Sequence, residues 1–150
     1  MTTSEQRATV LTGALRAAVA RDRAALSAAF TDDVRAWTPA LSTSSLTELL
    51  DELDHRDAAF SEIELDAEPL DVGGQHACVE WTVRMRHTGA ISLTDDVIIE
   101  PSGIGVTVHG VTIAEFDGDR ICSLRQYWDE SSVLEQLGVA ADASSPAAGR

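Results

Sequence analysis

The feature that most constrains the fold is a pair of runs, late in the chain, in which apolar and polar residues alternate. They lie on either side of Asp117-Gly118-Asp119. Alternation is typical of a strand with one buried face, and Asp-Gly between two such runs is typical of a β-hairpin turn. Asp129 follows the second run, where its carboxylate can accept hydrogen bonds from the free N–H groups of a helix. The sequence therefore predicts a long hairpin followed by a short C-terminal helix.

Three helices are expected before residue 60. Apolar residues recur at helical spacing from Glu5 to Ala20, and Asp22 can cap a second short helix that runs through Phe30. Leucines spaced along one face from Leu46 to Leu53 indicate a third helix, whose other face is acidic. A short strand, Val34 to Thr38, is expected between the second and third helices.

After Phe60 the apolar period changes from 3.6 to 2, which predicts strands. Gly73-Gly74 makes a turn between two of them. In the second of these strands an apolar face should point toward the helices: Val79, Trp81, Val83 and Met85. We interpret Gly89 to Gly105 as a long connection over the mouth of a pocket. Helices followed by a meander of strands predict an α+β fold with helices on one face of the sheet.

The amino-acid composition limits the kinds of molecule that the chain is expected to bind. Twenty-five acidic residues against eleven basic ones give a net charge of −14, which repels phosphate backbones and anionic membranes. We therefore expect neither a nucleic acid nor a membrane partner. All eleven basic residues are Arg, so Schiff-base and phosphate-loop lysine chemistry is excluded. Cys78 and Cys122 stand alone in apolar runs and are expected to be buried free thiols, rather than a disulfide or metal ligands.

The two ends of the chain predict a cellular location and a disordered segment. The N-terminus has no basic segment followed by an apolar core, and no run approaches the ~20 apolar residues of a membrane span. A cytoplasmic location is expected. Residues 139–150 are rich in Ala, Ser, Gly and Pro, which predicts a disordered tail after a domain over residues 1–138.

Four segments carry a resemblance to a known family: Phe30-Thr-Asp-Asp-Val, Phe116-Asp-Gly-Asp-Arg-Ile, Gln126-Tyr-Trp-Asp and Leu137-Gly138. They resemble the SnoaL-like (polyketide cyclase-like) branch of the nuclear-transport-factor-2-like and ketosteroid-isomerase-like superfamily. The resemblance implies a cone-shaped α+β barrel, with three N-terminal helices packed on a curved antiparallel sheet and a short C-terminal helix. Members include polyketide cyclases, ketosteroid isomerase, limonene-epoxide hydrolase and non-catalytic modules, so the fold does not settle the function.

The resemblance places the catalytic groups of relatives on residues that cannot move a proton. The general base of ketosteroid isomerase falls on Thr38 and its protonated oxyanion-hole Asp on Thr112. The acid/base Asp and the His of SnoaL-type cyclases fall on Gln126 and Thr112. Thr and Gln form hydrogen bonds but have no proton chemistry near neutral pH. Gln126 and Thr112 are therefore the first catalytic candidates, as hydrogen-bonding groups only.

Two ionisable candidates complete the catalytic set. Asp129 directly follows Gln126-Tyr-Trp, but its neighbours favour a helix cap over a catalytic acid. His109 is out of phase with Thr112, so alternation turns it away from the pocket unless a bulge intervenes. A surface or dimer contact is the favoured interpretation for His109. We expect no metal site and no cofactor.

The inner face is expected to hold a hydrophobic small molecule. The residues predicted to bind it are Thr38, Trp81, Val83, Met85, Leu124 and Trp128. The first functional hypothesis is a pocket protein that acts as a cofactor-free cyclase, isomerase or hydrolase on a polyketide-like or cyclic substrate. The rival is a non-catalytic binding or dimeric interaction module without the acid/base pair. A homodimer is predicted on the outer face through Val111, Ile113 and Tyr127.

Overall fold

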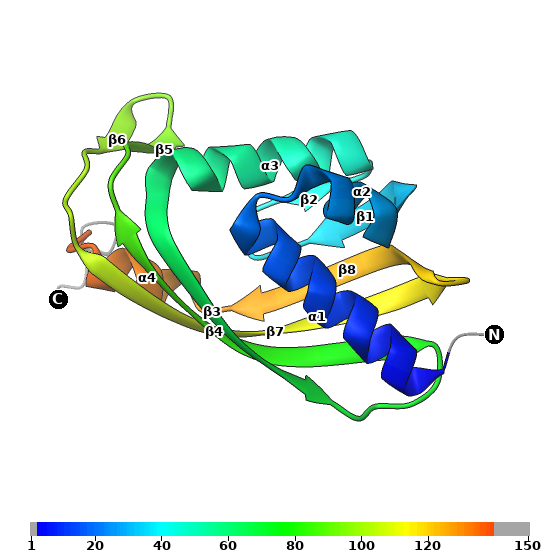
Figure 1. Ribbon diagram of the computed structural model, residues 1–150. Coiled ribbons are helices and arrows are strands. Elements are labelled where there is room, and N and C mark those ends of the chain that lie inside the picture. The colour runs from blue at the N-terminus through cyan, green and yellow to red at the C-terminus, as the bar shows by residue number, and fades with distance from the viewer. Residues whose placement is uncertain (1–2, 140–150) are drawn as a thin grey trace, which may run out of the picture.

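The computed structural model describes residues 3–139 and lays three helices on one face of a curved sheet (Figure 1). These three helices are α1 (Ser4–Ala20), α2 (Arg23–Ala29) and α3 (Leu46–Ala59). A fourth helix, α4 (Glu130–Gln136), follows the last strand. Each begins after a residue whose side chain accepts a hydrogen bond from a backbone N–H of the first turn: Thr3, Asp22, Ser45 and Asp129. Such caps are the reason why the helices begin at these residues.

Six strands form the main sheet in the order β2-β1-β8-β7-β4-β3. They are β1 (Phe30–Trp37), β2 (Ser42–Thr43), β3 (Phe60–Leu70), β4 (His76–His87), β7 (Gly105–Asp117) and β8 (Arg120–Trp128). Neighbouring strands are antiparallel, except that β1 runs parallel to β8. The predicted α+β class is therefore confirmed, with a curved sheet that the six described strands leave open rather than closed.

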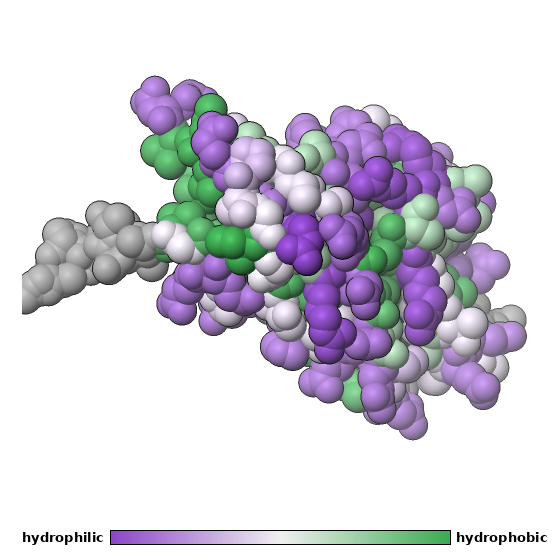
Figure 2. Space-filling model, turned by 60° about the vertical axis from the view of Figure 1, so that its left-hand side comes forward, coloured by the Kyte–Doolittle hydropathy of each residue, from purple (hydrophilic) through white to green (hydrophobic). Residues whose placement is uncertain are grey.

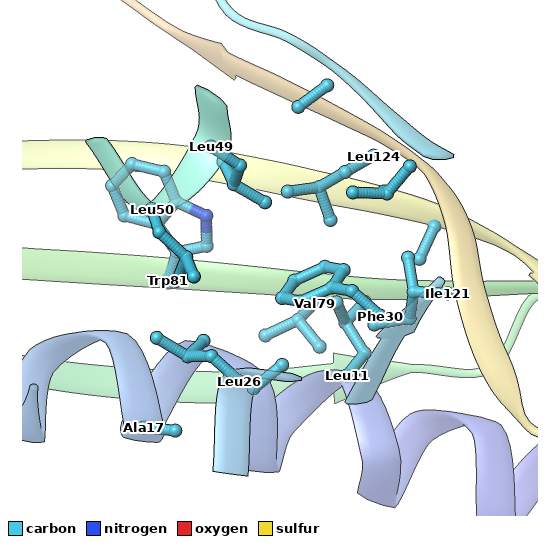
Figure 3. Packing of buried hydrophobic residues seen from close by; sticks show 14 of the residues in the cluster. Leu11, Ala17, Leu26, Phe30, Leu49, Leu50, Val79, Trp81, Ile121 and Leu124 are labelled. Atoms are coloured by element: carbon cyan, nitrogen blue, oxygen red, sulfur yellow. The ribbon is translucent and has the colours of Figure 1, made fainter. Parts of the chain in front are cut away.

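The core lies between the helices and the inner face of the sheet (Figure 3). Alternation works as predicted, because successive inward residues of β7 are buried while their neighbours are more exposed. α1 contributes Leu11, and β4 contributes Val79, both completely buried. Leu49 and Leu50 of α3 close the core from the other side.

Two segments differ from the prediction. Phe30 begins β1 instead of ending α2, because its side chain is buried in the core from an extended backbone. Residues 89–105 do not form one long connection, because they contain a second, two-stranded sheet of β5 (Ile91–Thr94) and β6 (Val97–Ile99). This hairpin stands beyond the end of α3 in Figure 1.

Of the predicted tail, residues 140–150 lie outside the described residues. Within residues 3–139, no helix has both the length and the apolar character that a membrane crossing requires.

Candidate functional site

Seven of the predicted site residues share the inner sheet face. Cross-strand register brings them together from three neighbouring strands, β4, β7 and β8. They are Trp81, Val83, Met85, Thr112, Leu124, Gln126 and Trp128. Sequence alternation alone was sufficient to select this face, because residues two apart on a strand point to the same side.

Trp81 and Thr112 form the polar centre of this face. The indole N–H of Trp81 donates to the hydroxyl oxygen of Thr112 at 2.8 Å, and the side-chain amide of Gln126 donates to the same oxygen at 3.2 Å. Thr112 has no exposed surface, and Trp81 is 8% exposed. The hydroxyl and the indole therefore bond to each other instead of presenting free groups to a ligand.

Gly110 makes room for the indole. It lies directly opposite Trp81 in the register, and a Cβ on Gly110 would overlap the outer edge of the Trp81 ring. Glycine inside a strand often marks such a close approach. This was a usable signal in the sequence, and the sequence analysis did not use it.

The inward side chains on the two sides of Trp81 differ in how deeply they are buried. Toward the Asp117-Gly118-Asp119 turn, the inward side chains are closely packed, as in Val79, Ala114 and Leu124. Toward α4, the inward side chains of Val83, Met85 and Trp128 are only half-buried. We call this second part of the inner face the α4 end. Val106 and Val108 of β7, the strand that α4 contacts, are buried there.

The surface near the α4 end is rich in apolar side chains. Figure 2 shows hydrophobic residues gathered below the tip of the β5–β6 hairpin. On β5, β6 and the segment that follows, the exposed members are Leu93, Val97, Ile98 and Ile104.

Two predicted residues have local structural roles at strand ends. The Thr38 hydroxyl accepts hydrogen bonds from the N–H groups of Ala40 and Leu41 at 3.1 and 3.2 Å, so it shapes the turn after β1. The Asp129 carboxylate accepts from the N–H of Ser132 at 3.2 Å and is the cap of α4. Both side chains are thereby held by backbone groups.

His109 lies on the outer face, as alternation indicates. Its Nδ1 is 3.0 Å from the Thr82 hydroxyl, and its side chain is exposed. With Tyr127 and Val111 it lines a hollow of about 670 Å³ on this face. Three carboxylates complete the rim: Asp66, Glu68 and Glu80. The structure therefore separates His109 from the inner face that holds Thr112.

His87 is an interior polar residue that sequence reasoning missed. It is completely buried at the end of β4, with Nδ1 accepting from the Ser102 N–H at 3.3 Å and Ser102 Oγ at 2.9 Å. Because Nδ1 accepts, Nε2 carries the proton. That atom is buried without a hydrogen-bond partner among the described residues, and the ring lies 5.6 Å from Phe60. Extending the alternation from Met85 by two residues would have found it.

Charges on the outer face are paired across strands. Arg84 contacts Asp66 at 2.9 Å and Arg86 contacts Glu62 at 3.1 Å. The hydrogen bond that the Arg84 guanidinium donates to the Asp66 carboxylate raises the pKa of Arg84 above its ordinary value. Both arginines of β4 therefore pair with carboxylates of the neighbouring strand β3. Within residues 3–139, no three His, Cys, Asp or Glu side chains gather as metal ligands would.

Comparisons with known proteins agree on the fold. A family model described as a SnoaL-like domain matches residues 11–124. No curated protein matches the chain in sequence.

Solved structures with low sequence identity to this chain have a similar fold. A candidate SnoaL-like polyketide cyclase from Jannaschia sp. CCS1 is 17% identical, with 92% of this chain and 94% of that chain covered and a TM-score of 0.80. AclR, a candidate hydroxylase from Streptomyces galilaeus, is 16% identical over 91% and 98%, with a TM-score of 0.76. An LEH-like epoxide hydrolase from M. tuberculosis is 15% identical over 95% and 98%, with a TM-score of 0.69. At these identities the likeness extends to the fold alone.

Proposed function

The chain belongs to the SnoaL-like domain family, and from this premise we propose that it binds a compact, apolar ring compound at the α4 end of its inner sheet face. The observation that carries the proposal is the contrast in burial on the two sides of Trp81. Val83, Met85 and Trp128 point inward and yet keep exposed surface, whereas Val79 and Leu124 are packed. Apolar walls with few polar groups are typical of small-molecule sites.

The chemistry of this face favours binding over acid–base catalysis. Of the polar inward groups beside the proposed site, the Thr112 hydroxyl and the Gln126 amide bond to each other at 3.2 Å, and the buried His87 at the end of β4 has its Nδ1 bonded to the Ser102 N–H. Neither the Thr112 hydroxyl nor the Gln126 amide exchanges a proton near neutral pH. Asp129 and His109, the ionisable candidates, are held in a helix cap and on the outer face. We therefore propose a binding protein without an interior acid/base pair.

The binding proposal is tested with 1-indanone, a compact two-ring ketone, in equilibrium dialysis against the full chain. Trp128→Ala removes a half-buried wall of the α4 end and should weaken binding about tenfold, the effect of losing roughly 1.4 kcal/mol of contact. The matched control is Trp37→Ala, because Trp37 is 42% exposed on the outer face. Equal loss in both variants, or no binding to the wild type, would contradict the proposal.

A cofactor-free cyclase, isomerase or hydrolase is the second candidate, and the structural neighbours with cyclase and hydrolase names favour it. Turnover separates the two candidates. Positioned acid–base groups contribute about 10²- to 10⁴-fold to a rate. We expect no isomerisation of a β,γ-unsaturated ketosteroid and no hydrolysis of limonene epoxide above the level of Gln126→Ala. Robust wild-type turnover that is lost in Asp129→Asn or His109→Gln would establish the enzyme instead.

A further inference from the structure

The indole of Trp81 lies where the packed part of the inner face meets the α4 end. Its N–H is bonded to Thr112 at 2.8 Å, and its ring covers Gly110 on the neighbouring strand. In Figure 3 the indole projects from β4 into the space that Leu49 and Leu50 of α3 also enter. The ring therefore belongs to the same core cluster as Leu49 and Leu50.

The indole is locked in this position. Turning it away would take the buried indole N–H from its acceptor, and leaving a buried donor without a partner is costly. The Gln126 amide, 3.2 Å from the same hydroxyl, supports the lock from β8. Gly110 supports it from below, because any other side chain at that position would collide with the ring.

We propose that Trp81 determines ligand size. This inference rests on the proposed binding function and names the ligand class more narrowly. The locked indole closes the inner face on the side of Thr112, so that a ligand at the α4 end can extend no further than the ring. The site accepts compounds of one or two fused rings and rejects those of four.

The test compares two ketones of different length, 1-indanone with two fused rings and oestrone with four, in equilibrium dialysis. Trp81→Leu shortens the side chain and opens the face toward Thr112. We expect oestrone to bind this variant at least about tenfold more tightly than it binds the wild type, because the added apolar area is removed from water. Binding of 1-indanone should change by less than about threefold.

A second variant guards against misfolding, since truncating a buried Trp leaves a cavity that destabilises the fold. Trp81→Phe keeps most of the ring and removes the N–H donor, so the ring loses its lock to Thr112. It should gain part of the oestrone affinity. Trp128→Leu is the matched control, because it shortens a Trp at the α4 end and should weaken both ketones without favouring oestrone.

The outcomes separate the two proposals. Selective gain of oestrone in the Trp81 variants supports the inference. If both ketones weaken equally in Trp81→Leu and Trp81→Phe, then Trp81 is an ordinary wall of the site, and the inference is wrong while the binding function stands. If 1-indanone does not bind the wild type, the proposed function fails and the inference fails with it.

Discussion

At the scale of single residues, Thr112 is the point where two side-chain hydrogen bonds of the interior meet. Its oxygen accepts from Trp81 and from Gln126, which are attached to two different strands. A hydroxyl with two lone pairs can satisfy both donors at once. The resemblance places the catalytic groups of relatives at Thr112. In this structure the Thr112 hydroxyl bonds to Trp81 and Gln126, and a bound ligand would have to leave these hydrogen bonds intact.

Replacing Thr112 by Val tests this task. The isosteric side chain keeps the volume but leaves the indole N–H buried without an acceptor, so we expect the free energy of unfolding to fall by about 1–3 kcal/mol. Urea denaturation measures it. Thr107→Val is the control on the same strand, because the Thr107 side chain is half-buried on the outer face and should tolerate the change within about 0.5 kcal/mol. Similar losses in both variants would contradict the assigned role.

The two cysteines predict a loss of stability at alkaline pH. Both are free thiols, and burial raises the pKa of Cys78 and of Cys122 above the ordinary thiol value. The folded chain then holds these protons at a pH where the unfolded chain has released them. Stability is therefore unaffected well below the ordinary thiol pKa and falls as the pH rises through and above it, from about pH 8 upward.

Few other groups titrate in that range, which makes the thiol measurement clean. The chain has no Lys and one Tyr, Tyr127. Urea unfolding under reducing conditions, at about pH 7.5 and about pH 9.5, should show a smaller decrease for Cys78→Ala with Cys122→Ala than for the wild type. An identical decrease in both proteins would assign the pH dependence to other groups.

At the scale of elements, the β5–β6 hairpin depends on a close approach at its base. The N–H of Gly89 donates to the carbonyl of Ala59 at 2.9 Å, and a Cβ on Gly89 would overlap the carbonyl oxygen of Ala58. Because that oxygen belongs to the backbone at the end of α3, it cannot move aside as a side chain would.

Gly89→Ala should therefore lower the free energy of unfolding by about 3 kcal/mol, the upper part of the range for overpacking. Gly105→Ala is the matched control, since a Cβ there meets open space, and it should change stability by less than about 0.5 kcal/mol. Differential scanning calorimetry compares the two variants. A stable Gly89→Ala protein would mean that the end of α3 and β5 separate easily.

Local patterns in the sequence predicted the helices, the long strands and the strand faces that point inward, but not the β5–β6 hairpin. The strands around Trp81 and Thr112 were identified because alternation is a property of neighbouring residues. The parallel pairing of β1 with β8 joins segments about ninety positions apart in the chain, as Phe30 with Ile121, and local patterns carry no such information. For the same reason the sequence placed Trp81 and Thr112 on one face but did not show that they bond to each other.

At the scale of the whole molecule, the outer face of the sheet lies on the side away from α1, α2 and α3 (Figure 1). Trp37 and Tyr127 lie on it with ring centroids 5.2 Å apart, and they are 42% and 46% exposed. Val111 and Ile113 are half-buried beside them. Exposed aromatic pairs on an open face are typical of protein interfaces. We propose that two copies associate through this face.

The net negative charge of each copy opposes this association, so the amount of dimer should depend on the salt concentration. Each copy carries a net charge of −14, so two copies repel at low salt, where the Debye length is about 30 Å at 0.01 M. At 0.15 M it is about 8 Å, and the apolar contact should dominate. Light scattering should therefore give a mass that rises with salt from 16.0 kDa toward twice that value.

The dimer prediction is sharpened by a matched pair of variants. Tyr127→Asp adds a charge in the middle of the outer face and should keep the chain monomeric at 0.15 M salt, because burying it between two acidic copies costs far more than one aromatic contact contributes. Leu93→Asp adds the same charge on β5, where Leu93 is 42% exposed, and should leave the dimer intact. A monomeric Leu93→Asp beside a dimeric Tyr127→Asp would move the interface to the hairpin. A wild type that stays at 16.0 kDa at all concentrations and salts would show that the outer face is not a self-association surface.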